Sequence, residues 1–293
     1  MDLSVFVQLL LPGLTTGCVY ALVALGFVLC ANVSGVVNFA QGEYVMLGGM
    51  VAASVFAHGL PLPLAVLAAV LAGACLGFAQ ERLTLAPVRS APDFIQITIT
   101  LGVAVVLRGL ALIVFGKDPL SLPGFSGDDV FQAAGAVLPL QSLWVWAATA
   151  LMLAASFGFL MRSAPGRAVR ACSINLQAAR LMGVDAERLA AAVFTVAAAA
   201  GALAGAVIAP IVLASWDAGI AYGLKGFVGA ILGSFRSPLV AVLGGLGIGV
   251  LESFAAGYVS SGYKDAIVYG VLLAYLLIRG GVFVFGRAAL ASR

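Results

Sequence analysis

The chain has 293 residues, of which 63% are hydrophobic and only 9% are charged, and its 15 Lys and Arg nearly balance its 12 Asp and Glu. Soluble domains carry about a quarter charged residues, so this composition excludes a soluble protein and places the chain in a lipid bilayer. The basic residues gather in one loop between apolar segments, which gives no indication of nucleic acid as a partner. Because apolar segments recur from end to end, we expect an all-α, polytopic transmembrane bundle that forms one domain over residues 1–293.

The apolar segments predict a series of membrane spans in chain order. A span needs about 20 apolar residues, at about 1.5 Å rise per residue. By that measure we expect spans at about 5–31, 36–57, 64–85, 94–116, 138–160, 189–213, 239–256 and 265–285. Residues 222–235 are apolar but too short to span comfortably, so the expected total is about eight or nine crossings.

Lysine and arginine near the span ends predict the orientation of the chain. The loop at about 162–188 holds five arginines, so it is expected in the cytoplasm together with the C-terminus. The acidic loop at 117–135 and the N-terminus, with Asp2, then fall outside. Arg108 lies near the outer end of its span, and we expect it to extend its side chain to the interface rather than to bind a solute.

The stretch 35–49, GVVNFAQGEYVMLGG, is polar at the start of a predicted span. A carboxylate at membrane depth costs several kcal/mol unless it is paired or faces water, so Glu43 is a candidate functional residue. Asn38 and Gln41 lie beside it in the sequence. The glycines of the stretch suit a helix that bends, breaks or packs tightly. The alternative is a short cytoplasmic turn whose polar groups are hydrated.

The segment 222–235 is Gly-rich and lies next to a full span, as in broken or re-entrant helices, which are tolerated where they line a cavity or are covered by protein. Two roles for Lys225 stay open: it extends to the membrane interface, or it meets a carboxylate such as Glu43. Glu252, near the end of the next span, either pairs with a basic group or lines the path. Glycine pairs such as Gly13/Gly17 predict packing seams within the bundle or with a partner.

We expect the start of the second span to line a water-accessible cavity that faces the 222–235 segment. For Glu43 two roles stay open, contact with a transported solute and support of the broken backbone, and we favour the second. The residues predicted to line this cavity, as a path through the membrane, are Asn38, Gln41, Glu43, Tyr44, Tyr222, Lys225, Phe227 and Glu252.

The loop at 162–188 also carries helix-capping signals. Asn175 is placed to cap a short helix over 176–182, and Gly183 suits the left-handed position that closes it. Asp185 is placed to cap the next helix. The loop therefore predicts a short helix between two spans that offers side chains for contact, and the alternative is an ordinary cytoplasmic loop with amphipathic character.

Three motifs together resemble the LivH-type permeases of branched-chain amino acid ABC importers: NFAQGE at 38–43, the short helix with paired alanines and a following glycine, and LKGFVGAILGSFRSP at 224–238. GGLGIGVLES at 244–253 and SSGYKDAIVYGVLLAYLLIRG at 260–280 fit as well. The resemblance implies a multi-pass permease subunit of the bacterial inner membrane that imports branched-chain or related amino acids. It also implies that the short helix is the coupling helix. The ATPase would then dock on Asn175, Ala178, Ala179, Leu181, Met182 and Gly183.

The chain has no ATPase motif of its own. A Walker A loop needs Gly-Lys followed by Ser or Thr, and none of Lys117, Lys225 and Lys264 fits. We expect no enzymatic activity, no bound cofactor and no metal site. The resemblance implies a homologous second permease subunit, two cytoplasmic ATPase subunits that hydrolyse ATP, and a periplasmic or lipid-anchored binding protein.

Two alternative functions stay open. One is an ion-coupled secondary transporter of small polar solutes, and the other is an ABC permease for amides or urea. The capped basic loop and the scarcity of acidic residues inside the spans oppose ion coupling.

Overall fold

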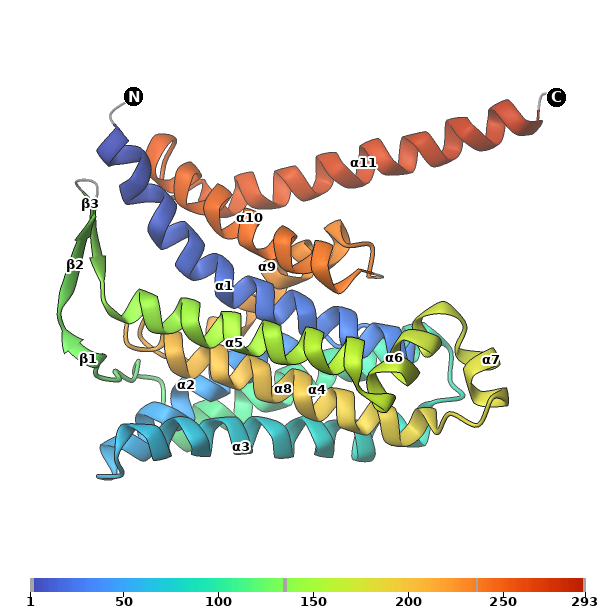
Figure 1. Ribbon diagram of the computed structural model, residues 1–293, viewed down its shortest axis with the longest axis horizontal. Helices are drawn as coiled ribbons and strands as arrows, with labels where there is room; N and C mark the ends of the chain where they lie inside the picture. Colours follow the sequence, from blue (N-terminus) through green and yellow to red (C-terminus); the bar gives the residue numbers. More distant parts are fainter. Residues whose placement is uncertain (1–2, 134–135, 236, 292–293) are drawn as a thin grey trace.

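The computed structural model describes residues 3–133, 136–235 and 237–291, and most of them are helical (Figure 1). The α-helices are α1 Leu3–Ser34, α2 Gln41–Ala57, α3 Leu62–Gln80, α4 Asp93–Phe115, α5 Gln141–Arg162, α6 Ala164–Ile174, α7 Leu176–Leu181, α8 Ala186–Ile208, α9 Ala218–Leu232, α10 Pro238–Tyr258 and α11 Lys264–Ala291. One π-helical turn, η1 Glu81–Leu85, continues α3, and a 3₁₀ turn, η2 Ala86–Val88, follows it. The strands are β1 Phe125–Asp128, β2 Val130–Ala133 and β3 Ala136–Pro139.

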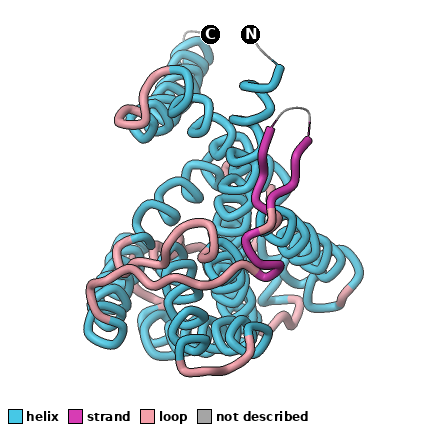
Figure 2. Tube along the Cα trace, turned by 90° about the vertical axis from the view of Figure 1, so that its left-hand side faces the viewer, coloured by secondary structure: helices cyan, strands magenta, loops and turns pink. Residues whose placement is uncertain are grey.

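The helices form a bundle whose two ends differ. Figure 1 shows α3, α8, α5, α1 and α10 one beside another, with the loop helices α6 and α7 at one end. We call this the arginine-rich end, because the arginines of the 162–188 loop lie there. At the opposite end, which we call the hairpin end, β2 pairs antiparallel with β3 and stands beside the start of α1 (Figure 2). Gln8 fixes it there, because its amide donates to the carbonyl of Val137 over 3.2 Å and accepts from its N–H over 2.8 Å.

Six helices of the described chain are long and apolar enough to cross a membrane: α1, α3 with its continuation, α4, α5, α8 and α10. The prediction of an all-α, polytopic membrane protein is therefore confirmed, and the short hairpin is an addition to it. The helices α2 and α9, with 17 and 15 residues, are shorter than a span. The number of crossings and the orientation stay predictions.

The centre of the bundle is α1, in which every residue from 17 to 30 is buried. A helix that is apolar on all sides is expected in such a position. It packs antiparallel to α10 along glycines of both helices. A Cβ atom on Gly17 would lie 2.8 Å from the carbonyl oxygen of Leu246, and one on Gly13 would lie 2.9 Å from Cβ of Ser253. Among the described residues, these glycines form seams within the chain itself.

The helix α2 is held in the same way between α8 and α9. A Cβ atom on Gly48 would overlap the backbone of Ala202, and one on Gly205 would overlap the backbone of Val45. On the other side, a Cβ atom on Gly42 would overlap the backbone of Gly219 in α9. The start of α2 therefore faces the half-helix α9, as the sequence predicted, and it does so at backbone contact distance.

Candidate functional site

The start of α2 carries a hydrogen-bonded group of polar side chains with the last residue of α3. Gln80 donates its amide to Oδ1 of Asn38 over 2.7 Å, and it accepts a short hydrogen bond from the hydroxyl of Tyr44. The same Asn38 oxygen accepts from the N–H of Ala40 over 3.2 Å, which organises the turn before α2. Gln80 was missed by the sequence analysis, because a lone glutamine at the end of an apolar run gives no pattern of its own.

Gln41 ties α2 to α8 in the interior. Its Nε2 donates to the carbonyl of Ala197 over 2.9 Å, while its Oε1 has no hydrogen-bond partner among the described residues. The side chains of Asn38, Gln41 and Tyr44 are completely buried, and Glu43 is 2% exposed. The expectation of water-accessible side chains at this place is therefore wrong for this structure. The glycine contacts of α2 with α8 and α9 close the space that a cavity would need.

Glu43 pairs with Arg108 of α4 and not with Lys225. Nη2 of Arg108 lies 2.5 Å from Oε1 of Glu43. The second carboxylate oxygen, Oε2, lies against Gly219 of α9 and has no hydrogen-bond partner among the described residues. The prediction that Arg108 extends to the interface is thus corrected, because its guanidinium is drawn to the buried carboxylate and its side chain is only 21% exposed.

Lys225 lies in a second charged cluster, between α9, α10 and α11. Its Nζ is 2.6 Å from Oε1 of Glu252 and 2.8 Å from Oδ1 of Asp265. Lys264 reaches the same Glu252 oxygen over 3.2 Å, and the hydroxyl of Tyr20 donates to the other oxygen over 2.7 Å. Of the alternatives left open for Glu252, the structure shows pairing with basic groups. The predicted path residues therefore divide into two clusters with different partners.

The two aromatic residues of α9 lie on different sides of this division. Tyr222 packs near Tyr20 of the Lys225 cluster, with 6.2 Å between the ring centroids. Phe227 packs against Phe39, just before α2, with 5.2 Å between the centroids, and against Phe27 of α1 over 5.7 Å. The half-helix α9 therefore contacts both polar clusters, and it is the element that connects them.

The loop at the arginine-rich end has the predicted caps and one helix more than predicted. Oδ1 of Asn175 accepts from the N–H of Ala178 over 3.0 Å, and Gly183 has φ of +87°, in the left-handed region. The additional helix is α6. Ser163 caps it through a 2.9 Å hydrogen bond from the N–H of Gly166, and Pro165 occupies its first turn. Ser-x-Pro is a helix-start signal that the sequence analysis passed over.

Asp185 caps α8 as predicted. Its Oδ1 accepts from the N–H of Glu187 over 3.2 Å and from the N–H of Arg188 over 3.0 Å. The backbone hydrogen bond from Arg188, together with the positive charge of that side chain, lowers the pKa of Asp185 below its ordinary value. The carboxylate form is therefore the one that the cap favours.

The expected docking residues differ in exposure. Leu181 and Met182, in the turn that ends α7, are 89% and 86% exposed, and Asn175, Ala178 and Gly183 are exposed as well. Ala179 is the exception, since it is 5% exposed and belongs to an apolar cluster with Val169, Cys172 and Leu189. The prediction that Ala179 offers a contact surface is therefore corrected: it holds α7 to the bundle.

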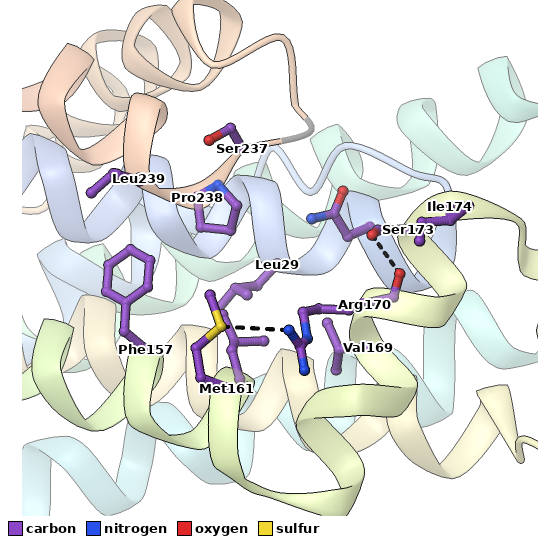
Figure 3. A pocket seen from close by; sticks show the side chains of 12 residues that line it. Leu29, Phe157, Met161, Val169, Arg170, Ser173, Ile174, Ser237, Pro238 and Leu239 are labelled. Carbon is purple, nitrogen blue, oxygen red and sulfur yellow. Dashed lines mark hydrogen bonds between the residues drawn. The ribbon is translucent and has the colours of Figure 1, made fainter.

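A cavity of about 360 Å³ lies beside this loop, between the end of α1, the end of α5, α6 and the start of α10 (Figure 3). Its walls are mostly apolar. Arg170 lines it from α6, with 3.5 Å between Nη1 and the sulfur of Met161. Pro238, the first residue of α10, and its N-cap Ser237 line the opposite side. It is separate from both polar clusters, and it leaves α6 without close packing against α10.

Comparison with known proteins gives one consistent result. Residues 9–276 match the family described as branched-chain amino acid transport system / permease component. The chain belongs to this permease family. It is 30% identical over 288 residues to the high-affinity branched-chain amino acid transport system permease protein LivH of Escherichia coli K12, with 93% of each chain covered. It is also 30% identical to the corresponding protein BraD of Pseudomonas aeruginosa, with 94% of each covered. No solved structure matches the chain significantly.

The similarity to permeases extends beyond one named substrate. The ribose import permease protein RbsC of Escherichia coli K12 is 28% identical over 264 residues, which is 87% of this chain and 80% of that protein. Membership in the permease family therefore agrees with the membrane fold and with a role in transport, and the choice of substrate needs its own evidence.

Proposed function

We propose that the chain is the permease subunit of an ATP-binding-cassette importer that carries branched-chain or related amino acids into the cell. The observation that carries the proposal is the end-to-end similarity to LivH and BraD, whose names state this substrate class. The resemblance of the NFAQGE and LKGFVGAILGSFRSP motifs supports it, and the two motifs lie together, since Phe39 of the first packs against Phe227 of the second with 5.2 Å between the ring centroids. The membrane is the bacterial inner membrane.

The energy comes from separate subunits in this proposal. Leu181 and Met182 expose apolar side chains at the arginine-rich end, on the turn that follows the helix capped by Asn175. A cytoplasmic ATPase binds to this surface. Neighbouring apolar side chains that are exposed on an ordered turn indicate a surface for protein contact. The complex contains two such ATPase subunits, a homologous second permease and a binding protein that delivers substrate.

The path runs past the start of α2. A zwitterion with an apolar side chain needs a few polar contacts in otherwise apolar walls, and the start of α2 with its neighbours provides both. Because Asn38, Gln41 and Glu43 are buried against α3, α8 and α9, transport requires the start of α2 to separate from these neighbours. This contact must open and close during transport, because a substrate held tightly in a closed site would not be released.

The test is uptake by the whole complex in proteoliposomes, with the second permease, the ATPase subunits and the binding protein present and labelled leucine as substrate. The expected result is uptake that requires ATP on the ATPase side. An excess of unlabelled isoleucine or valine should inhibit it, and an excess of ribose or urea should not. Uptake that follows an ion gradient and proceeds without ATP would instead show a secondary transporter. Competition by urea or amides alone would change the substrate class.

A further inference from the structure

Arg89, in the turn after η2, holds two carboxylates from different parts of the chain. Its Nη1 lies 2.9 Å from Oε2 of Glu187 in the first turn of α8, and its Nη2 makes a shorter contact with Oε1 of Glu81. The two partners differ in environment, because the Glu81 side chain is 2% exposed and that of Glu187 is 65% exposed. One guanidinium therefore joins a surface carboxylate to a buried one, which its planar, forked geometry permits.

The buried partner leads directly to the polar group at the start of α2. Glu81 follows Gln80, the residue that hydrogen-bonds both Asn38 and Tyr44. The chain between Glu81 and Leu85 is a π-helical turn, in which the hydroxyl of Thr84 donates to the carbonyl of Gln80 over 2.6 Å. Single π-turns inside helices recur at functional sites, because they change which side chains face inward. Movement of Glu81 along this turn would displace Gln80 with it.

The exposed partner lies close in sequence to the turn with Leu181 and Met182, which we call the docking turn. Glu187 is two residues from the α8 cap at Asp185, and the left-handed Gly183 and the exposed Met182 come just before that cap. Movement of a protein bound to Leu181 and Met182 would therefore displace the start of α8. Arg89 therefore connects to Asn38 through Glu81 and the neighbouring Gln80. It connects to the docking turn through Glu187 and the cap at the start of α8.

We propose that Arg89 is a positioning residue for transport: by holding Glu187 and Glu81 together, it transmits movement of the docking turn to the polar group at the start of α2. The inference rests on the proposed function, since it needs an ATPase at the docking turn. An apolar cluster that includes Leu85, Ala179 and Leu189 also joins these segments, but Arg89 joins them through charged groups that single substitutions can remove.

Open space lies beside the Arg89 side chain. A pocket of about 290 Å³ lies at this place, and Glu81, Arg89, Leu176 and Arg180 line it together with Gly35 of the α1–α2 turn. An ion pair with a partner as exposed as Glu187 contributes little to stability. Its loss should therefore alter transmission of movement much more than folding, and the two effects can be measured apart.

The experiment uses the complete transporter in proteoliposomes and measures leucine taken up per ATP hydrolysed. Glu187→Gln removes the exposed charge and keeps the shape of the side chain. We expect uptake per ATP to fall roughly tenfold, a change within the usual range of coupling between sites, with the melting temperature of the complex unchanged. Arg89→Gln should reduce uptake per ATP to the same level, and the double variant should fall no further, because both residues act in one chain of contacts. Arg89→Gln also takes the guanidinium from the buried Glu81, so its melting temperature should fall, and uptake is therefore compared per ATP hydrolysed by the folded complex.

Arg188→Gln is the matched control. Arg188 also pairs with a carboxylate at the start of α8, with 2.9 Å between its Nε and Oδ2 of Asp185, but this pair stays within one helix turn. It should keep the unaltered uptake per ATP. The proposal is overturned if Glu187→Gln keeps the unaltered ratio, or if the losses of the two single variants add in the double variant. Absence of ATP-driven uptake in the unaltered complex would overturn the proposed function itself and, with it, this role of Arg89.

Discussion

Arg108 of α4 donates a hydrogen bond to Glu43 of α2, with 2.5 Å between Nη2 and Oε1. The carboxylate is 2% exposed, and a charge so deep in an apolar bundle is stable only when it is paired. Glu43 also lies in the first turn of α2, where the positive end of the helix dipole favours a negative charge. The pair therefore connects α4 to the contact between α2 and α9, and it is the part of the candidate site that variants can probe most directly.

The first prediction concerns this pair. Arg108→Gln leaves Glu43 buried with one partner fewer, so it should lower the free energy of unfolding by about 3 kcal/mol, as when one member of a buried pair is removed. Glu43→Gln leaves a partly exposed guanidinium without its partner, so it should lower the free energy of unfolding by less than Arg108→Gln does. The double variant should be more stable than Arg108→Gln alone. Thermal unfolding in detergent measures the three values, and Arg162→Gln, which changes an exposed arginine at the end of α5, is the control.

Transport by Glu43→Gln separates the two roles of this carboxylate. If it supports the structure, uptake persists at a reduced protein level, because the amide keeps the hydrogen-bonding shape without the charge. Loss of uptake at a normal protein level would show that the charge itself takes part in transport, and that result would contradict the structural role.

The second prediction concerns the Lys225 cluster, in which each charge has more than one partner. Lys225→Met leaves Glu252 with Lys264 and with the hydroxyl of Tyr20, and Lys264→Met leaves it with Lys225. Each single variant should therefore lose less stability than Arg108→Gln does. The double variant removes both cations, so its loss should exceed the sum of the single losses by about 1 kcal/mol or more. A double-mutant cycle of melting temperatures measures the excess, and strictly additive losses would show that the two lysines act independently.

The sequence predicted the helices well and the partners of the charged side chains poorly, for a physical reason. The spans follow from runs of apolar residues, and the caps of Asn175 and Asp185 follow from rules that act within four residues of the chain. Which cation meets Glu43 depends on how α4 and α9 pack against α2, and nothing local to 35–49 records that packing. From the sequence, Lys225 was considered as a partner of Glu43 and Arg108 was expected at the interface, because nothing in either apolar segment shows which cation packs against α2.

The failed prediction of an open cavity has the same origin. Polar residues among glycines at 35–49 are typical both of a solvated path and of a seam where backbones touch. In this chain, Gly42 and Gly48 bring α9 and α8 to contact distance, and the polar side chains satisfy one another or backbone carbonyls. Only the three-dimensional arrangement separates these two cases. The same holds for Ala179, whose burial depends on α6, a helix that the sequence analysis had not predicted.

The third prediction concerns the docking turn. Leu181→Ser and Met182→Ser, made together, remove two exposed apolar side chains and leave the caps of α7 and α8 in place. Folding should be unaffected, and binding of the ATPase subunits should weaken roughly tenfold or more, because burial of each Leu or Met side chain at an interface contributes about 1.5–3 kcal/mol. Co-purification of the ATPase subunits from the membrane measures this. Equally strong binding would place the docking surface elsewhere, and Leu64→Ser, at an exposed leucine near the hairpin end, serves as control.

The fourth prediction concerns pH and the cap of α8. The pKa of Asp185 is lowered from its ordinary value of 3.8, chiefly by the N–H of Arg188. The cap is thus fully present above the ordinary value and is lost as the pH falls through the lowered pKa. Hydrogen exchange at the amides of Glu187 and Arg188, corrected for intrinsic rates, should rise as the pH falls below the ordinary value of 3.8 and through the lowered pKa. Asp185→Asn caps without titrating, so its exchange should stay constant, and an equal rise in both proteins would contradict the assignment.

The last prediction compares two glycines of α10. Gly249 lies against α1, where a Cβ atom would overlap the backbone of Gly17, whereas a Cβ atom on Gly247 would meet nothing within 4 Å. Gly249→Ala must therefore push α10 away from α1, and overpacking of this kind typically costs about 1–3 kcal/mol. Gly247→Ala adds a methyl group in open space and gains helix propensity, worth up to about 1 kcal/mol. The melting temperature should fall for Gly249→Ala and stay equal or rise for Gly247→Ala. Equal shifts in the two variants would mean that α1 and α10 are not in backbone contact and do not form the central packing seam of the bundle.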